Sequence, residues 1–338
     1  MIFGDTPVAE AEGCVLAHSL LVGGRKWPKG RVIDRADVET LRAANIPCVV
    51  AARLEPGDVA EDPAATRLAR AVAGDGLTTS TATTGRVNLH AATDGLVVID
   101  TAGVHRLNGV NEAVTLATIP PWQPITARTM VATIKIIPFA VPDSVLTACL
   151  PATPLLRVAP WRGLRAGLLQ TRVRGTKDSV LAKTTEATAR RLASCGASLI
   201  AEERCTHRTA DVVAALETLR AADCDLLLLV GASAITDRCD VLPTAVVAAG
   251  GRITHLGMPV DPGNLLMLAN WDGVPVLGLP GCARSPRLNG ADWVLWRLAT
   301  GLPVAPADIM GMGVGGLISE VPGRPMPRAR ASSPQTMP

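Results

Sequence analysis

The run LLLLV at residues 226–230 constrains the fold more than any other stretch of the chain. Five consecutive apolar residues leave no polar face, so a strand made from them is buried on both sides, as in the parallel sheets of α/β proteins. The run leads into GASA at residues 231–234, and two acids, Asp237 and Asp240, stand before the next apolar stretch. The sequence therefore predicts a buried strand whose exit loop of small residues lets a ligand approach the backbone closely.

Strand-like and helix-like segments alternate on both sides of this run. The further strand candidates are residues 168–173, 198–202, 252–255 and 274–279. The helix candidates are residues 179–194, 209–222, 241–249 and 288–299. Segments of these lengths in this order predict an α/β domain over residues 163–302, with a doubly wound, mostly parallel sheet and helices on both faces.

The first half of the chain has a different pattern. Residues 1–76 mix short strands with helices, and ADVETLRAANI at 36–46 fits an amphipathic helix capped by Asp34, which indicates a small N-terminal α+β segment. Residues 77–150 are rich in Val, Ile and Thr with DG, NG and PP turns, which predicts a small β-rich module. Residues 311–338, rich in Gly, Pro, Ser and Arg, are expected to form a disordered tail.

The composition argues against several classes of function. A net charge of +3, no long Lys/Arg block, no Tyr and only two Phe argue against a nucleic-acid-binding protein. Eight cysteines without a CxxC pair fit reduced thiols better than a zinc site or a disulfide framework. The N-terminus lacks signal-peptide character, and no apolar run approaches the ~18 residues needed to span a bilayer. We therefore expect a cytoplasmic protein.

Two strand exits together predict one ligand site. In open α/β sheets, ligands bind beyond the carboxyl ends of the strands, near a topological switch point. The loop after residue 230 is one such exit, and the Gly-Pro-Gly turn in VPVLGLPGCARSP at 274–286 is another. The helix starting near Val241 would direct backbone N–H groups at an anion. Neither loop matches GxGxxG or GxxxxGK[ST]. The residues predict a cradle for a phosphate-like anion, with ordinary βα connections as the alternative.

Each single candidate residue also has a structural explanation. Asp240 stands where it would cap the following helix, and Asp178 stands in the same position before an earlier one. Asp261, followed by Pro-Gly, fits a turn. His207 and His255 have no partner at metal-ligand spacing. No Ser-His-Asp or Cys-His set emerges from the sequence.

At these loops the chain resembles the molybdopterin-binding family of molybdenum cofactor biosynthesis, which includes molybdopterin adenylyltransferases and molybdotransferases. The family signature is a buried strand, a loop of the form TGG(T/V)(G/S) and an acid that opens a helix; here Ala232 stands at the second Gly. GVPVLGLPGCARSP at 273–286 is similar to the molybdotransferase segment G-x-P-V-x-G-L-P-G-N-P-x-S, with Cys282 in place of Asn. Residues 29–59 also resemble the molybdotransferase segment before the binding domain, whereas QTRVRGTKDS at 170–179 replaces the usual STGDE-like segment.

The resemblance implies a transferase that binds molybdopterin and adenylates it or inserts molybdate, with Mg²⁺ and ATP as further ligands of such a reaction. Asp240 and Asp237 would be the catalytic and metal-binding acids. The residues expected to contact the ligand are Gly231, Ala232, Ser233, Ala234, Asp178, Ser179, Asp261, Gly263, Pro280, Gly281, Cys282 and Ser285.

Two other functions remain open at this point. The first is a non-catalytic carrier or regulatory module that hands molybdopterin, or its nucleotide form, to a nucleotidyltransferase or a molybdoenzyme. It is favoured by Ala232 and by the altered segment at 170–179, and the variant group that the chain resembles best is often fused to a C-terminal nucleotidyltransferase domain. The second is a different nucleotide-metabolising α/β enzyme. The family resemblance also implies self-association into a homo-oligomer. No membrane partner is expected, because no apolar run is long enough to span a bilayer.

Overall fold

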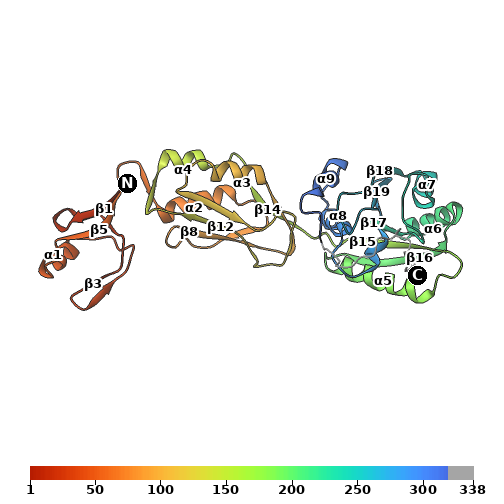
Figure 1. The fold of residues 1–338 in the computed structure, drawn as a ribbon, viewed down its shortest axis with the longest axis horizontal. Helices are drawn as coiled ribbons and strands as arrows, with labels where there is room; N and C mark the ends of the chain where they lie inside the picture. Colours follow the sequence, from red (N-terminus) through yellow and green to blue (C-terminus); the bar gives the residue numbers. More distant parts are fainter. Residues whose placement is uncertain (319–338) are drawn as a thin grey trace, which may run out of the picture. The chain divides into compact units, whose positions relative to one another are not determined.

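The computed structural model describes residues 1–318, which fold into two compact units with a border between Trp161 and Arg162 (Figure 1). Among these residues no helix has the length and apolar character needed to cross a membrane.

The N-terminal unit begins with a small sheet in the order β1-β5-β2 and a hairpin, β3-β4. Its elements are β1 (Ile2–Pro7), η1 (Val8–Glu10), β2 (Val15–Leu16), β3 (Leu20–Val22), β4 (Arg25–Trp27), α1 (Arg35–Ala43) and β5 (Cys48–Arg53). The predicted cap Asp34 starts α1, because its carboxylate accepts the Asp37 N–H at 2.8 Å. Arg31 adds two 2.7 Å bonds to the Asp37 carboxylate and thereby lowers its pKa.

The rest of the N-terminal unit packs its strands and helices around an apolar core separate from that of residues 8–51. The elements are β6 (Asp58–Ala60), α2 (Glu61–Val72), β7 (Leu77–Thr79), β8 (Arg86–Ala91), β9 (Gly95–Ile99), α3 (Thr101–Asn108), β10 (Val114–Thr118), β11 (Pro124–Ile125), β12 (Met130–Ile136), β13 (Ala140–Pro142), α4 (Asp143–Cys149) and β14 (Leu156–Pro160). Leu68 of α2, Leu89 of β8 and Ile134 of β12 are fully buried in it. The core thus spans the boundary predicted at residue 76, and the predicted β-rich module also contains α3 and α4.

The second unit is built on a six-stranded sheet in the order β16-β15-β17-β20-β19-β18. Its strands are β15 (Arg165–Arg172), β16 (Ser198–Thr206), β17 (Leu226–Val230), β18 (Arg252–Leu256), β19 (Met267–Trp271) and β20 (Val274–Gly278). Strands β16, β15, β17 and β20 pair in parallel, and only β19 pairs antiparallel with both of its neighbours. The predicted α/β fold with a mostly parallel sheet is therefore confirmed.

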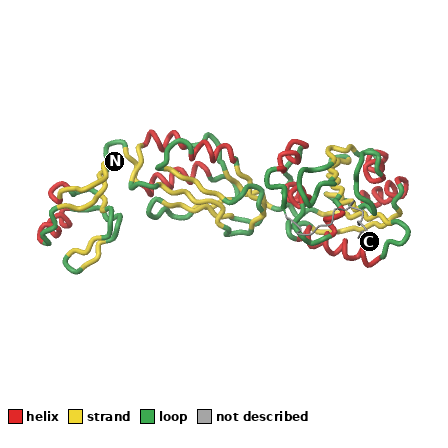
Figure 2. Tube along the Cα trace, in the orientation of Figure 1, coloured by secondary structure: helices red, strands yellow, loops and turns green. Residues whose placement is uncertain are grey.

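Helices cover both faces of this sheet (Figure 2). They are α5 (Asp178–Ala193), α6 (Thr209–Ala221), α7 (Val241–Ala248) and α8 (Gly290–Ala299), followed by α9 (Pro306–Met310); the short turns are η2 (Gly281–Arg284) and η3 (Gly311–Gly313). Leu227 and Leu229 of β17 pack with α6 and α7. On the opposite face, Gln170 of β15 donates to the Leu181 carbonyl of α5. All five residues of β17 are buried, which explains the unbroken apolar run.

The strand order places a topological switch point between β15 and β17. From β15 the chain passes through α5 to β16 on one side, and it returns through α6 to β17 on the other side. The loops that leave β15 and β17 therefore run in opposite directions, which opens a crevice between the carboxyl ends of these strands.

The end of the described chain is ordered beyond the predicted start of the tail. Asp261 accepts the Ile318 N–H at 2.9 Å through its carbonyl and donates its own N–H to Gly316 at 2.8 Å. Met312 is buried. The predicted start of the disordered tail, residue 311, is thus placed too early, because backbone hydrogen bonds hold residues 316 and 318 against the second unit. The remainder of that prediction, residues 319–338, lies outside the described residues.

Candidate functional site

A pocket of about 350 Å³ lies at the switch point. Its walls come from three loops, which follow β15, β17 and β20. The lining residues are Thr171, Gly175, Thr176, Lys177, Val180, Gly231, Ala232, Ser233, Ala234, Gly281 and Arg284. The two strand exits predicted to form one ligand site therefore do meet in space.

The small residues of the β17 exit have a local reason as well as an expected functional one. A Cβ atom at Gly231 would lie 2.5 Å from the Ser233 carbonyl oxygen, so the loop itself requires glycine there. The next N–H, that of Ala232, donates to Thr171 Oγ1 at 2.8 Å and ties the loop to the end of β15. Gly281 differs, because a Cβ at that position would meet no atom within 4 Å. Gly231 shapes the wall, whereas Gly281 leaves space beside it.

The pocket is positively charged. Arg284 is half-buried, and its guanidinium donates to the Gly231 carbonyl at 2.8 Å. Burial lowers the pKa of this guanidinium. No acidic residue lines the pocket, and within residues 1–318 no carboxylate forms an ion pair with Arg284 or Lys177. A half-buried cation without a carboxylate partner, in a pocket without lining acids, gives a local environment that favours an approaching anion.

The first turn of α5 borders the same pocket. Thr176, Lys177 and Val180 are lining residues, and α5 begins directly after Lys177. No side chain caps this end of the helix by a hydrogen bond. Because the first N–H groups of a helix lack intrahelical partners, they add positive potential to the side of the pocket where Lys177 stands.

Arg191 fixes the loop that carries Arg284. Its guanidinium forms an ion pair with Asp292 of α8, and both side chains are buried. The same guanidinium donates to the carbonyls of Ala283 at 3.2 Å, Ser285 at 2.8 Å and Arg287 at 3.4 Å. One buried cation from α5 therefore sets the backbone course on both sides of Arg284.

Asp240 and Asp237 are used by their own loop. Asp240 Oδ2 accepts the N–H groups of Thr236 at 2.6 Å and Asp237 at 3.0 Å, and the Thr236 hydroxyl at 3.0 Å. These bonds lower the pKa of Asp240. Asp237 Oδ1 accepts the Cys239 N–H at 2.7 Å. Neither acid lines the pocket, and the Asp240 side chain does not bond to the first turn of α7.

Over the part of the chain that the structure describes, no group of three or more His, Cys, Asp or Glu side chains could hold a metal ion. The Mg²⁺ roles of Asp240 and Asp237 remain predictions.

The other predicted site residues separate into two groups. Five of them line the pocket: Gly231, Ala232, Ser233, Ala234 and Gly281. Seven do not line it: Asp178, Ser179, Asp261, Gly263, Pro280, Cys282 and Ser285. Asp178 pairs with Arg172 at 3.5 Å, and Cys282 Sγ lies 3.0 Å from Asn289 Nδ2. Gly263 packs against the backbone of Gly290. These contacts give Asp178, Cys282 and Gly263 structural roles beside the site.

Sequence reasoning missed several residues at this site, among them Thr171, Lys177, Arg284 and His207. Thr171 lies 2.8 Å from His207 Nδ1, and His207 Nε2 lies 3.2 Å from Ser233 Oγ. Arg284 stands inside a segment that carries the family resemblance, and Lys177 stands inside residues 170–179, where the chain departs from the family. A basic residue in each strand-exit loop was therefore an available signal. His207 follows the end of β16 and gave no signal, since its partners are distant in sequence.

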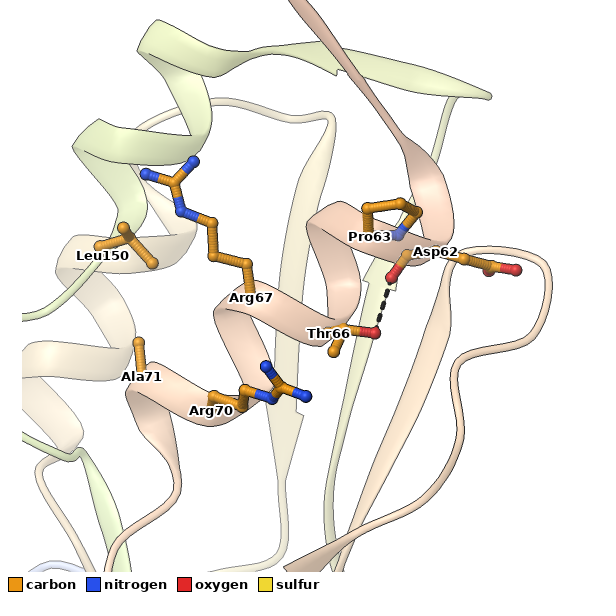
Figure 3. Close-up of a pocket in the computed structure, with 7 residues that line it drawn as sticks. All are labelled: Asp62, Pro63, Thr66, Arg67, Arg70, Ala71 and Leu150. Carbon is orange, nitrogen blue, oxygen red and sulfur yellow. Dashed lines mark hydrogen bonds between the residues drawn. The ribbon is translucent and has the colours of Figure 1, made fainter.

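A larger hollow of about 860 Å³ lies along α2 in the N-terminal unit (Figure 3). Arg67 there pairs with Asp143 and also donates to the Thr147 hydroxyl. The Thr66 hydroxyl donates to the Asp62 carbonyl, the dashed contact in Figure 3. None of the predicted ligand-binding residues lines this hollow, and we assign no function to it.

Comparison with known proteins gives the following matches. A family model described as "Domain of unknown function (DUF8806)" matches residues 5–50. No curated protein matches the chain. Three similar crystal structures are a MoaB molybdopterin biosynthesis enzyme from Thermus thermophilus, a MoeA molybdopterin biosynthesis protein from Pyrococcus horikoshii and a molybdopterin biosynthesis protein from Mycobacterium abscessus.

The three structural likenesses are distant. The MoaB match is 17% identical, with a TM-score of 0.29, and covers 41% of this chain and 98% of that chain. The MoeA match is 12% identical, with a TM-score of 0.30, and covers 89% of this chain and 76% of that chain. The Mycobacterium abscessus match is 16% identical, with a TM-score of 0.28, and covers 41% and 92%.

Replacement of Arg191 by Leu tests the buried ion pair. The change leaves the Asp292 carboxylate buried without its partner, so we expect the free energy of unfolding of the second unit to fall by about 3–5 kcal/mol. Urea denaturation followed by tryptophan fluorescence, with Trp293 and Trp296 in α8 as reporters, measures it. The matched control is Arg190→Leu, which removes only an exposed pair with Glu186 and should cost about 0.5 kcal/mol or less. Equal losses for the two variants would contradict this role of Arg191.

The Asp240 carboxylate gives the β17 exit loop a pH dependence. The pKa of Asp240 in the folded loop is lower than the usual 3.8. Its contribution to the stability of the folded loop is therefore present above 3.8 and is lost as pH falls through the folded-state pKa. We expect the amide proton shifts of Thr236 and Asp237 to titrate together with a midpoint below 3.8, and this titration to vanish in Asp240→Asn. NMR measures both shifts. In the control, Asp237→Asn, the Thr236 midpoint should persist; a midpoint at or above 3.8 in the wild type would refute the role.

Proposed function

We propose that the chain binds molybdopterin, or its nucleotide form, as part of molybdenum cofactor biosynthesis, with the phosphate end of the ligand in the pocket between β15 and β17. The carrying observation is Arg284, a half-buried guanidinium in a pocket with no acidic lining residue. The family resemblance of the GASA loop and of GLPGCARSP at 278–286 supports molybdopterin as the ligand.

The charges of the pocket support a phosphate as the bound group. Arg284 stands on the β20 side and Lys177 on the β15 side, next to the uncapped start of α5. A phosphate supplies the anionic partner that both cations lack among the described residues, and it accepts backbone N–H groups at a helix start. A volume of about 350 Å³ lies at the lower end of the range for ligand pockets, which fits one end of a pterin ligand rather than all of it.

A transferase role extends this proposal. Adenylyl transfer or molybdate insertion would bring ATP or molybdate, with Mg²⁺, to the edge of the pocket where Asp240 and Asp237 follow the GASA loop. These carboxylates could take part through their second oxygens, because the N–H groups of Thr236, Asp237 and Cys239 occupy one oxygen of each.

A second candidate function is a non-catalytic carrier that hands the pterin to a nucleotidyltransferase or to a molybdoenzyme. The hydrogen bonds of Asp240 within its own loop favour it, since they lower the pKa of this carboxylate and so make it a weaker base. Self-association, implied by the resemblance, is compatible with either role.

Substitution of the two cations tests the binding proposal. Removing a charge-assisted bond to phosphate should weaken molybdopterin binding by about ten- to a hundredfold in Arg284→Ala and in Lys177→Ala. Anaerobic isothermal titration calorimetry measures the dissociation constants. Arg287→Ala is the matched control, because this exposed arginine belongs to the same loop and does not line the pocket. The proposal fails if the wild type does not bind, or if Arg284→Ala binds as tightly as Arg287→Ala.

A turnover assay separates carrier from transferase. With molybdopterin, ATP, Mg²⁺ and molybdate present, the weak basicity of Asp240 leads us to expect neither adenylated molybdopterin nor active cofactor. Chromatography of the pterin products and reconstitution of an apo-molybdoenzyme measure the two outcomes. Product formation that is abolished in Asp240→Asn and retained in Glu217→Gln, an exposed acid on α6, would reject the carrier role and support the transferase.

A further inference from the structure

Three side chains at the pocket form a continuous hydrogen-bond chain. Thr171 Oγ1, at the end of β15, accepts the Ala232 N–H at 2.8 Å and lies 2.8 Å from His207 Nδ1. His207 Nε2 lies 3.2 Å from Ser233 Oγ. The imidazole, just past the end of β16, thus joins a buried hydroxyl at the end of β15 to an exposed hydroxyl in the loop after β17.

Thr171, the buried end of this hydrogen-bond chain, fixes which atoms donate along it. Thr171 is fully buried, and its oxygen already accepts the Ala232 N–H. Its own O–H proton needs an acceptor, because a buried hydroxyl without one is unfavourable. His207 Nδ1 is the acceptor in reach. An Nδ1 that accepts carries no proton in a neutral imidazole, so the ring proton sits on Nε2.

This tautomer determines the role of Ser233 at the exposed end of the hydrogen-bond chain. The Nε2–H of His207 donates to Ser233 Oγ. Since that oxygen is engaged as an acceptor, the hydroxyl proton of Ser233 is available to a further group. Ser233 is exposed and lines the pocket, where Arg284 and Lys177 supply positive charge and no acid stands. Each donor in such a chain polarises the next, so the terminal O–H is a stronger donor than an isolated serine.

We propose that Ser233 donates a hydrogen bond to a phosphate oxygen of the bound ligand, and that His207 is the positioning residue that orients and polarises the Ser233 hydroxyl. This inference rests on the proposed phosphate site and adds a specificity element to it. His207 does not line the pocket, and it acts on the ligand only through Ser233. The chain selects for a ligand group that accepts a hydrogen bond at this position.

A double-mutant cycle tests this coupling. The probe is inorganic phosphate, and ³¹P NMR titration gives its dissociation constant for the wild type, Ser233→Ala, His207→Ala and the double variant. Each single change should weaken binding about tenfold, and the double variant should also lie near tenfold, because His207 acts through Ser233. Additive losses, about a hundredfold in the double variant, would overturn the inference, as would a His207→Ala variant that binds like the wild type.

Arg284→Ala separates failure of the inference from failure of the proposed function. The fold-loss of phosphate affinity in Arg284→Ala should multiply with the fold-loss in Ser233→Ala, since the two side chains contact the phosphate independently. Weakened binding in Arg284→Ala beside an unchanged His207→Ala keeps the phosphate site and overturns the role of His207. Absence of phosphate binding by the wild type overturns both.

The tautomer of His207 gives a second readout that needs no ligand. In the wild-type protein at neutral pH, the ¹⁵N shifts of the His207 ring should show a protonated Nε2 and an unprotonated Nδ1. Thr171→Val removes the hydroxyl that fixes this state while keeping the shape of the side chain, so the variant should lose the preference for the Nε2–H form. A wild-type ring protonated at Nδ1 would overturn the inference even if every variant folded and bound phosphate.

Discussion

The pocket walls depend on the contacts that the buried guanidinium of Arg191 forms with Asp292 and with the loop of Arg284. A charge taken out of water needs a counter-ion and good hydrogen bonds, and this one has Asp292 together with the carbonyls of Ala283 and Ser285 on either side of Arg284. Helix α5, helix α8 and the loop after β20 are thereby locked to one another. Arg284 extends from that loop to the Gly231 carbonyl and links it to the β17 exit. The pocket wall is therefore held by buried polar contacts.

The polar groups around the pocket are divided between two tasks. Acids in the region are satisfied locally: Asp292 by Arg191, and Asp240 by the N–H groups of its own loop. Cations and donors point to the pocket, where Arg284, Lys177 and the Ser233 hydroxyl gather. This division explains why acids in a strand-exit loop, which first indicate a metal site, coexist with a pocket whose charged lining residues are Arg284 and Lys177.

Local patterns predicted much of the second unit. The apolar run of β17 has one stable environment, a sheet covered on both faces, and regular helix periods around it predicted α5, α6, α7 and α8 within a few residues. Strand β19 was missed, because the apolar run LLMLA at 265–269 does not coincide with the strand, which continues through Asn270 to Trp271. In the N-terminal unit, the eight-residue helix α3 was too short to show a clear period.

The site was predictable only in part, because its contacts are tertiary. The GASA loop and Gly281 were found from strand-exit chemistry alone. His207, in contrast, is separated by 36 residues from Thr171 and by 26 from Ser233, and nothing in its sequence neighbourhood indicates either partner. Asp240 was predicted as a helix cap or a metal ligand, since local sequence does not show that its carboxylate turns back to the N–H groups of Thr236 and Asp237.

A crystal structure of the protein grown with molybdopterin tests the central claim most directly. We predict the ligand phosphate between β15 and β17, with an oxygen at hydrogen-bond distance, about 2.7–3.2 Å, from the Arg284 guanidinium and another from Ser233 Oγ. A phosphate bound instead along α2 beside Arg67 and Arg70, or in the crevice but out of reach of Arg284, would contradict the account.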